Sequence, residues 1–137
     1  MATTTAKNSA QTLALVIGVV FVLVGIAGFF VTGFDNFAAP SEDSTLFIFD
    51  VNPLHNIVHL LLGAAGISLS RTADGARTYG MLLAVGYGLA FIYGLVVVGE
   101  TTGINFLNIN KADNILHIVS ALAGAAILML ARRPATA

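Results

Sequence analysis

The chain has 137 residues, of which 57% are apolar and only 9% are charged. Its mean hydropathy of +0.90 is typical of an integral membrane protein and excludes an ordinary soluble domain. A net charge of -1 gives no indication of nucleic-acid binding, and the absence of cysteine excludes disulfides, thiolate metal sites and cysteine nucleophiles. No polar stretch is long enough for a second, soluble domain, so we expect one membrane domain over residues 1–137.

Four apolar segments are long enough, or nearly so, to cross a bilayer as helices. They cover about residues 13–32, 53–70, 79–99 and 114–131. All four must be helical, because unpaired backbone groups are not tolerated in lipid and four spans are too few to close a barrel. The sequence therefore predicts an all-α fold, a bundle of four transmembrane helices.

The charges between the spans predict the orientation of the bundle. Basic residues gather near the termini and in the loop after the second span: Lys7, Arg71, Arg77, Arg132 and Arg133. Most acidic residues lie in the loops after the first and third spans. The excess of basic residues on the cytoplasmic side of membrane proteins then predicts a plasma-membrane protein with both termini in the cytoplasm. A cleaved signal peptide is the alternative for the first span, and the length of its apolar run argues against it.

Two parts of the chain repeat each other. The stretch NPLHNIVHLLLGAAG from Asn52 aligns without a gap with NKADNILHIVSALAG from Asn110. GFFVTG from Gly28 aligns with GLVVVG from Gly94 if the first loop is allowed several extra residues. Because each copy contains two spans, both enter the membrane in the same sense. We therefore expect two parallel-repeat helical hairpins, related by a pseudo-twofold axis along the membrane normal.

The repeated stretch begins with helix-capping residues and continues as a polar and small-residue stripe. Asn52 and Asn110 are placed to cap their helices, and Pro53 takes the favoured first helical position. The two stripes are Asn56, His59, Gly63 and Gly66 in the second span, and Asn114, His117, Ala121 and Gly124 in the fourth. We expect these spans to meet along their stripes, with close packing at the small residues and hydrogen bonds from Asn56 to His117 and from Asn114 to His59.

The histidines leave three interpretations open. In the first, polar contacts between helices are their whole role. In the second, His59 and His117 are the two axial ligands of a haem b. In the third, His55, His59, His117 and Asp113 hold a divalent metal, because His55 and His59 lie four residues apart on one helix face and Asp113 is the equivalent of His55 in the second copy.

These interpretations correspond to different classes of protein. The first predicts a structural or accessory protein, a packing or assembly subunit in the lipid bilayer that is homo-oligomeric or part of a membrane complex. The second and third predict a haem- or metal-binding membrane protein. An oligomeric transporter or channel ranks behind both, because no span contains a charge to select ions. No catalytic constellation is present, so we expect no enzyme activity. Among the tyrosines, we expect Tyr79 at the membrane interface and Tyr87 in helix packing or in contact with lipid.

The helix starts also carry a family resemblance. The pattern Asn-Pro-x-His-Asn-x-x-His occupies residues 52–59, and Asp-Asn-x-x-His occupies residues 113–117. With these motifs the chain resembles a family of small four-helix membrane proteins, common in actinobacteria and catalogued as a domain of unknown function. The resemblance runs from the first span to the fourth. It implies an integral membrane protein and supplies no activity, substrate or cofactor.

Overall fold

A computed structural model describes residues 7–131. It contains four helices, which are α1 (Ser9–Thr32), α2 (Pro53–Leu69), α3 (Ala73–Val97) and α4 (Lys111–Leu130). The strands of the described residues are β1 (Thr45–Leu46) and β2 (Phe49–Asp50), an antiparallel pair in the loop after α1. The expected all-α, four-helix bundle is confirmed. Arg132 and Arg133, which contributed to the expected orientation, lie outside the described residues.

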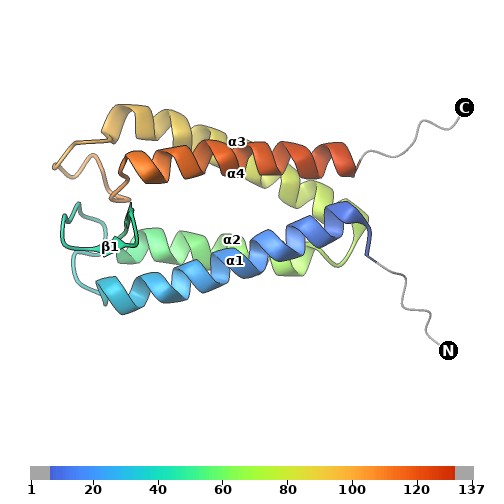
Figure 1. Ribbon diagram of the computed structural model, residues 1–137, viewed down its shortest axis with the longest axis horizontal. Coiled ribbons are helices and arrows are strands. Elements are labelled where there is room, and N and C mark those ends of the chain that lie inside the picture. Colours follow the sequence, from blue (N-terminus) through green and yellow to red (C-terminus); the bar gives the residue numbers. More distant parts are fainter. Residues whose placement is uncertain (1–6, 132–137) are drawn as a thin grey trace, which may run out of the picture.

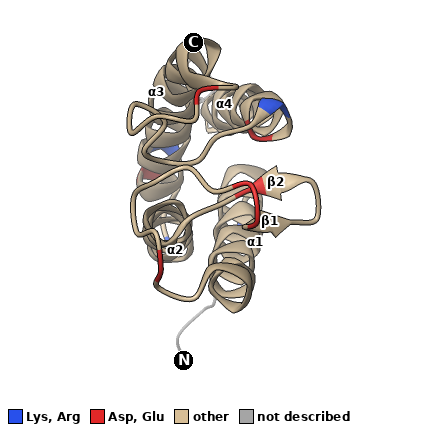
Figure 2. Cartoon of the chain, turned by 90° about the vertical axis from the view of Figure 1, so that its left-hand side faces the viewer, with Lys and Arg blue, Asp and Glu red and all other residues tan. Residues whose placement is uncertain are grey.

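The bundle consists of two helical hairpins. α1 packs along α2, and α3 packs along α4 (Figure 1). The long loops within the two hairpins lie together at one end of the molecule, and acidic residues are prominent in them (Figure 2). The short turn at residues 70–72 joins the hairpins at the opposite end, where α1 begins and α4 ends.

Each helix is preceded by an N-cap residue, whose side chain accepts a hydrogen bond from a backbone N–H group in the first turn. The four capping residues are Asn8, Asn52, Thr72 and Asn110. At the start of α1 and of α4 the bond is reciprocal, because Gln11 and Asp113 accept from the capping residue's own N–H group. Pro53 occupies the first turn of α2. Backbone N–H groups in this turn have no acceptor within the helix, so the lack of one in proline costs no hydrogen bond.

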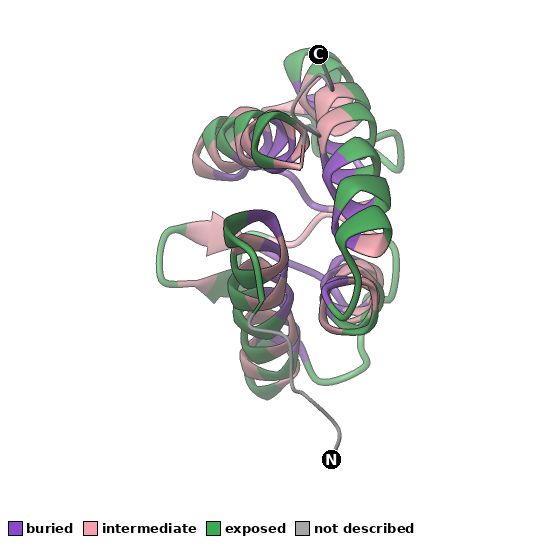
Figure 3. Cartoon of the chain, turned by 90° about the vertical axis from the view of Figure 1, so that its right-hand side faces the viewer, coloured by how far each residue is buried: buried purple, intermediate pink, exposed green. Residues whose placement is uncertain are grey.

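Three of the helices are long and apolar enough to cross a membrane. These are α1, α3 and α4, with 24, 25 and 20 residues. α2 is apolar but has 17 residues, which is about 26 Å of helix against a hydrocarbon core of about 30 Å. Buried residues face the interior of the bundle, and much of the outward surface of the helices is exposed (Figure 3). Long apolar helices with an exposed outer surface therefore indicate a membrane protein.

Small residues set the distance between the helices within each hairpin. A Cβ atom at Gly18 of α1 would lie 2.9 Å from the carbonyl oxygen of Gly63 in α2. A Cβ atom at Gly124 of α4 would lie 2.7 Å from the carbonyl oxygen of Gly80 in α3. The expectation that the second and fourth spans meet is wrong, since no Cα atom of α2 lies within 8 Å of one in α4. Gly63 and Gly124 instead pack against the partner helix of their own hairpin.

Gly66 and Tyr79 form a contact between the hairpins, near the turn at residues 70–72 that joins them. A Cβ atom at Gly66 would lie 2.6 Å from the Tyr79 ring, so the glycine makes room for this ring. Tyr79 is fully buried in the bundle and does not face the lipid, and its expected depth at the membrane interface stays a prediction. Ala121, the remaining small residue of the stripes, is buried in the same apolar core.

Candidate functional site between the hairpins

Asparagine side chains join the two long loops. The Asn52 amide donates to the carbonyl oxygens of Phe106, at 2.7 Å, and Ala39, at 3.2 Å. The Asn110 amide donates to the carbonyl oxygen of Ile48, at 2.9 Å. Asn52 and Asn110 are equivalent in the sequence alignment, and Ile48 and Phe106 each precede them by four residues. The two hairpins therefore exchange the same hydrogen bond in both directions.

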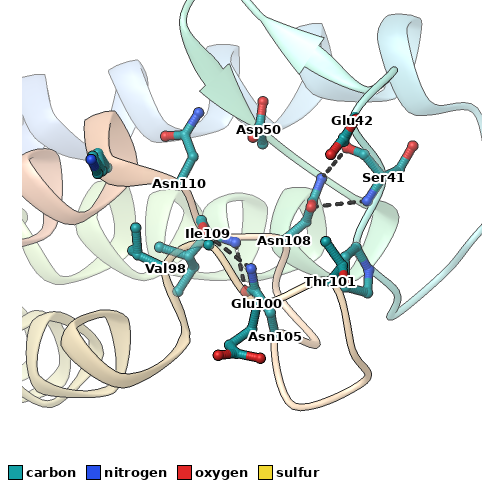
Figure 4. Close-up of a pocket in the computed structure, with 13 residues that line it drawn as sticks. Ser41, Glu42, Asp50, Val98, Glu100, Thr101, Asn105, Asn108, Ile109 and Asn110 are labelled. Atoms are coloured by element: carbon teal, nitrogen blue, oxygen red, sulfur yellow. Dashed lines mark hydrogen bonds between the residues drawn. The ribbon is translucent and has the colours of Figure 1, made fainter.

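Asn108 reinforces this junction and Asn105 braces the second loop, and the sequence analysis singled out neither. Asn108 exchanges two hydrogen bonds with the backbone of Ser41, at 3.0 Å each (Figure 4). It also donates to the carbonyl oxygen of Val51. Asn105 bonds in the same manner to the backbone of Ile109, four residues along the chain. The density of asparagine over residues 105–114 was the available signal, because a buried amide can pair with backbone donors and acceptors in loops.

A cavity of about 450 Å³ lies between the two loops, beside these asparagines (Figure 4). Its walls include the carboxylates of Glu42, Asp50 and Glu100 and the ammonium group of Lys111. The buried amides of Asn105 and Asn108 in its wall are already bonded to backbone. This arrangement fastens the loops together and leaves no buried polar group pointing to a ligand.

The Asn56 and Asn114 side chains turn toward their own hairpins. Asn56 packs against Gly28 of α1, and Asn114 packs in the corresponding way against Gly94 of α3. The Asn56 amide donates to the Thr32 hydroxyl at 3.0 Å, within the first hairpin. A side chain on either glycine would occupy the space of the amide. The two glycines therefore leave room for the amides to point into their own hairpins, away from the opposite one.

This orientation removes the expected hydrogen bonds between asparagine and histidine. Among the bonds of residues 7–131 there is none from Asn56 to His117 and none from Asn114 to His59. The side-chain oxygens of both asparagines are buried without a hydrogen-bond partner. The expected asparagine–histidine bonds are therefore wrong, and the polar neighbours of His55 and His117 are backbone groups, among them Leu107 for His55 and Ala90 for His117.

Three histidines converge at the centre of the bundle although the backbones of α2 and α4 stay apart. The ring centroid of His55 lies 4.7 Å from that of His59 and 6.2 Å from that of His117. Phe21 stacks on His59 at 5.5 Å, Tyr87 meets His117 at 5.5 Å, and Phe21 and Tyr87 meet each other at 5.5 Å. Each hairpin thus supplies one histidine with one aromatic ring packed against it.

His55 and Asp113 occupy equivalent positions in the two hairpins but play different parts. Both occupy the third helical position, where the backbone N–H group bonds to the capping asparagine. The Asp113 carboxylate turns back to accept from the N–H group of Asn110, at 3.1 Å. The His55 ring points inward to His59 instead. Asp113 therefore acts as part of a helix cap, and the histidine cluster has three members.

The three histidines line a cavity of about 170 Å³ between α2 and α3, with His117 of α4 in its wall. Each histidine is at most 4% exposed. The Nδ1 atom of each is buried without a hydrogen-bond partner in the described chain, as is the Tyr87 hydroxyl. Backbone groups of Leu107 and Asp50 nevertheless lie beside the His55 ring, and that of Ala90 lies beside the His117 ring. An unpaired buried polar group costs about 1–3 kcal/mol. Polar groups gathered around one cavity indicate that it holds a polar occupant, either water or a ligand. The full set of lining residues is His55, Val58, His59, Leu62, Leu82, Gly86, Tyr87, Ala90, Leu107 and His117.

This geometry favours neither of the cofactors considered from the sequence. Within residues 7–131, no group of three or more His, Cys, Asp or Glu side chains is arranged to hold a metal ion. Binding sites for drug-sized molecules measure about 300–1,000 Å³. A cavity of about 170 Å³ is therefore too small for a porphyrin.

The fold and the cavity define the class of this protein as a small, all-helical membrane bundle with a histidine-lined interior. Residues 11–130 match the family model described as Domain of unknown function (DUF4383), and the chain belongs to this family. The resemblance inferred from the helix starts is confirmed at the level of the family. No curated protein matches the chain. No solved structure matches it.

Proposed function

We propose that this protein binds a small, neutral, polar molecule in the cavity between its hairpins, through His55, His59 and His117. The observation that carries the proposal is the set of three buried imidazoles with unpaired Nδ1 atoms around one cavity. The cavity has no charged residue in its lining, so it favours an uncharged ligand. The site is a binding site, and we propose no reaction for it.

We propose further that all four helices span the plasma membrane as two parallel-repeat hairpins, with both termini in the cytoplasm. The reciprocal bonds of Asn52 and Asn110 support the repeat. Lys7, Arg71 and Arg77 lie toward the end opposite the long loops, which supports a cytoplasmic location for that end. The short helix α2 suits this arrangement because its polar first turn lies among the loops.

The proposal is tested by NMR on protein with ¹⁵N-labelled histidine in mild detergent. The chain has three histidines, all in the cavity, so every imidazole signal reports on the site. Phenol is the probe, and toluene is the matched control because it has the same ring without the hydroxyl group. We expect phenol to shift the Nδ1 signals saturably and toluene to shift them far less. Equal responses to both compounds, or none to phenol, would contradict the proposal.

A packing or assembly subunit is the second candidate function. The glycine contacts within the hairpins support it, because they make a close-packed bundle without any ligand. In that case the histidines are core residues, and a complex of the protein with copies of itself or with another membrane protein is its working form. Cross-linking in native membranes tests this: a discrete oligomer would support the candidate, and a monomer would contradict it. For the third class, an oligomeric transporter or channel, no contact in the described chain adds support.

A further inference from the structure

The histidine cavity adjoins a groove on the outer face of α3. The groove measures about 630 Å³ and is lined by Arg77, Thr78, Met81, Leu82, Val85 and Gly86. Leu82 and Gly86 also line the histidine cavity, so the two spaces share a wall. A Cβ atom at Gly86 would meet no atom within 4 Å. At Gly86 the shared wall therefore has no side chain and has room for one.

The groove faces the surroundings of the bundle. Met81 is 50% exposed and Val85 is 53% exposed, on the outward side of α3. Gly86 lies two and a half turns from Arg77, or about 13 Å along the helix. If Arg77 lies at the membrane surface, Gly86 lies well inside a hydrocarbon core of about 30 Å. A molecule that reaches the histidines past Gly86 therefore comes from the lipid.

The size of the cavity limits the part of the molecule that enters. A dry protein cavity of about 150 Å³ accepts benzene. The histidine cavity, at about 170 Å³, therefore has room for one six-membered ring with small substituents. Its apolar walls, among them Val58, Leu62 and Leu107, suit the ring itself. The groove of about 630 Å³ beside it has room for an apolar chain attached to that ring.

The polar groups around the cavity determine which ring fits. A neutral imidazole can present its Nδ1 atom as a donor, and a tyrosine hydroxyl can also donate. His59 and Tyr87 can thus donate into the cavity from α2 and α3, since backbone groups already lie beside the His55 and His117 rings, and no carboxylate lines the cavity to accept. Two carbonyl oxygens on opposite edges of a neutral ring match such donors. We propose that the ligand is a single-ring, membrane-soluble quinone, an inference that rests on the proposed function. The quinone enters from the lipid past Gly86, and its tail lies in the groove.

The experiment measures binding of decylplastoquinone to the full chain in lipid nanodiscs, by the ¹⁵N signals of the three histidines. Decylbenzene is the control probe, because it has the same tail and ring without the oxygens. Gly86→Phe fills the shared wall. Gly88→Phe is the matched control variant, since a Cβ atom there also meets nothing within 4 Å and Gly88 lines neither space.

We expect saturable binding of decylplastoquinone and not of decylbenzene, weakened at least tenfold by Gly86→Phe and unchanged by Gly88→Phe. A melting temperature of Gly86→Phe close to that of Gly88→Phe shows that the variant folds. If phenol binds and decylplastoquinone does not, or if both phenylalanine variants behave alike, this inference is overturned and the proposed function stands. If phenol does not bind to the natural chain either, the proposed function is contradicted together with this inference.

Discussion

The side chains of Asn52 and Asn110 make the same hydrogen bond in opposite directions across the junction of the hairpins. Asn52 donates to the carbonyl oxygen of Phe106 at 2.7 Å, and Asn110 donates to that of Ile48 at 2.9 Å. Each asparagine also caps the helix that follows it. One residue type therefore starts a helix and fastens it to the other hairpin, and this positions the histidines that follow within the next two turns.

Replacing either asparagine should destabilise the bundle more than the loss of a cap alone. Asn52→Ala and Asn110→Ala remove a cap worth about 1 kcal/mol. They also remove a bond between hairpins worth about 1 kcal/mol more. Asn8→Ala is the control, because Asn8 caps α1 without any bond between the hairpins. Thermal unfolding in mild detergent should give the smallest loss for Asn8→Ala. Equal losses in all three variants would show that the junction contributes nothing.

Close packing within the hairpins should make two glycines intolerant of alanine. At Gly18 and Gly124 the added Cβ atom would lie within 3.0 Å of backbone atoms of the partner helix, so the helices must separate. We expect a loss of about 1–3 kcal/mol for each variant. Gly88→Ala meets open space and should leave stability unchanged or raise it by up to about 1 kcal/mol through helix propensity. Comparison of the three melting temperatures tests this, and a tolerated Gly18→Ala would refute the close approach.

The histidines should contribute little to folding. His59→Phe and His117→Phe keep an aromatic ring in place and remove an unpaired Nδ1 atom, so the melting temperature should stay the same or rise. The same variants should lose the response to phenol. A fall in melting temperature comparable with that of Asn52→Ala would instead support the packing or assembly candidate.

The proposed orientation can be checked with single cysteines, because the natural chain contains none. Thr101 lies in the loop after α3, and Ala73 lies at the first turn of α3 on the opposite side. Both are exposed. A membrane-impermeant maleimide applied to intact cells should label Thr101→Cys and not Ala73→Cys, and permeabilised cells should allow both. The reverse pattern would place the termini outside.

Much of the fold was accessible from the sequence because lipid imposes strict rules on it. Uncharged runs of about 20 residues have to be helices, and asparagine before Pro53 or three residues before Asp113 is a local signal for a helix start. The alignment of NPLHNIVH with NKADNILH also picked out the asparagines and histidines that occupy corresponding places in the hairpins. These predictions depend on short-range chemistry, which a sequence displays directly.

Which helices pair could not be predicted in the same way. The stripe containing Gly63 and Gly66 indicates a close contact but does not identify the partner, and Gly18 of α1 provides it. The direction of the Asn56 amide depends on the missing side chain of Gly28, which lies 28 residues away in the chain. The pairing of His59 with Phe21, and of His117 with Tyr87, likewise follows from that packing. The binding cavity is therefore a property of the tertiary structure.

The most direct test of the central claim is a crystal structure at high resolution, grown from a lipid phase in the presence of phenol. We predict one ring in the cavity, with its oxygen within hydrogen-bond distance of at least one Nδ1 atom of His55, His59 or His117. A cavity that contains only water, or nothing, with phenol present at saturating concentration would contradict the proposal that these histidines bind a ligand.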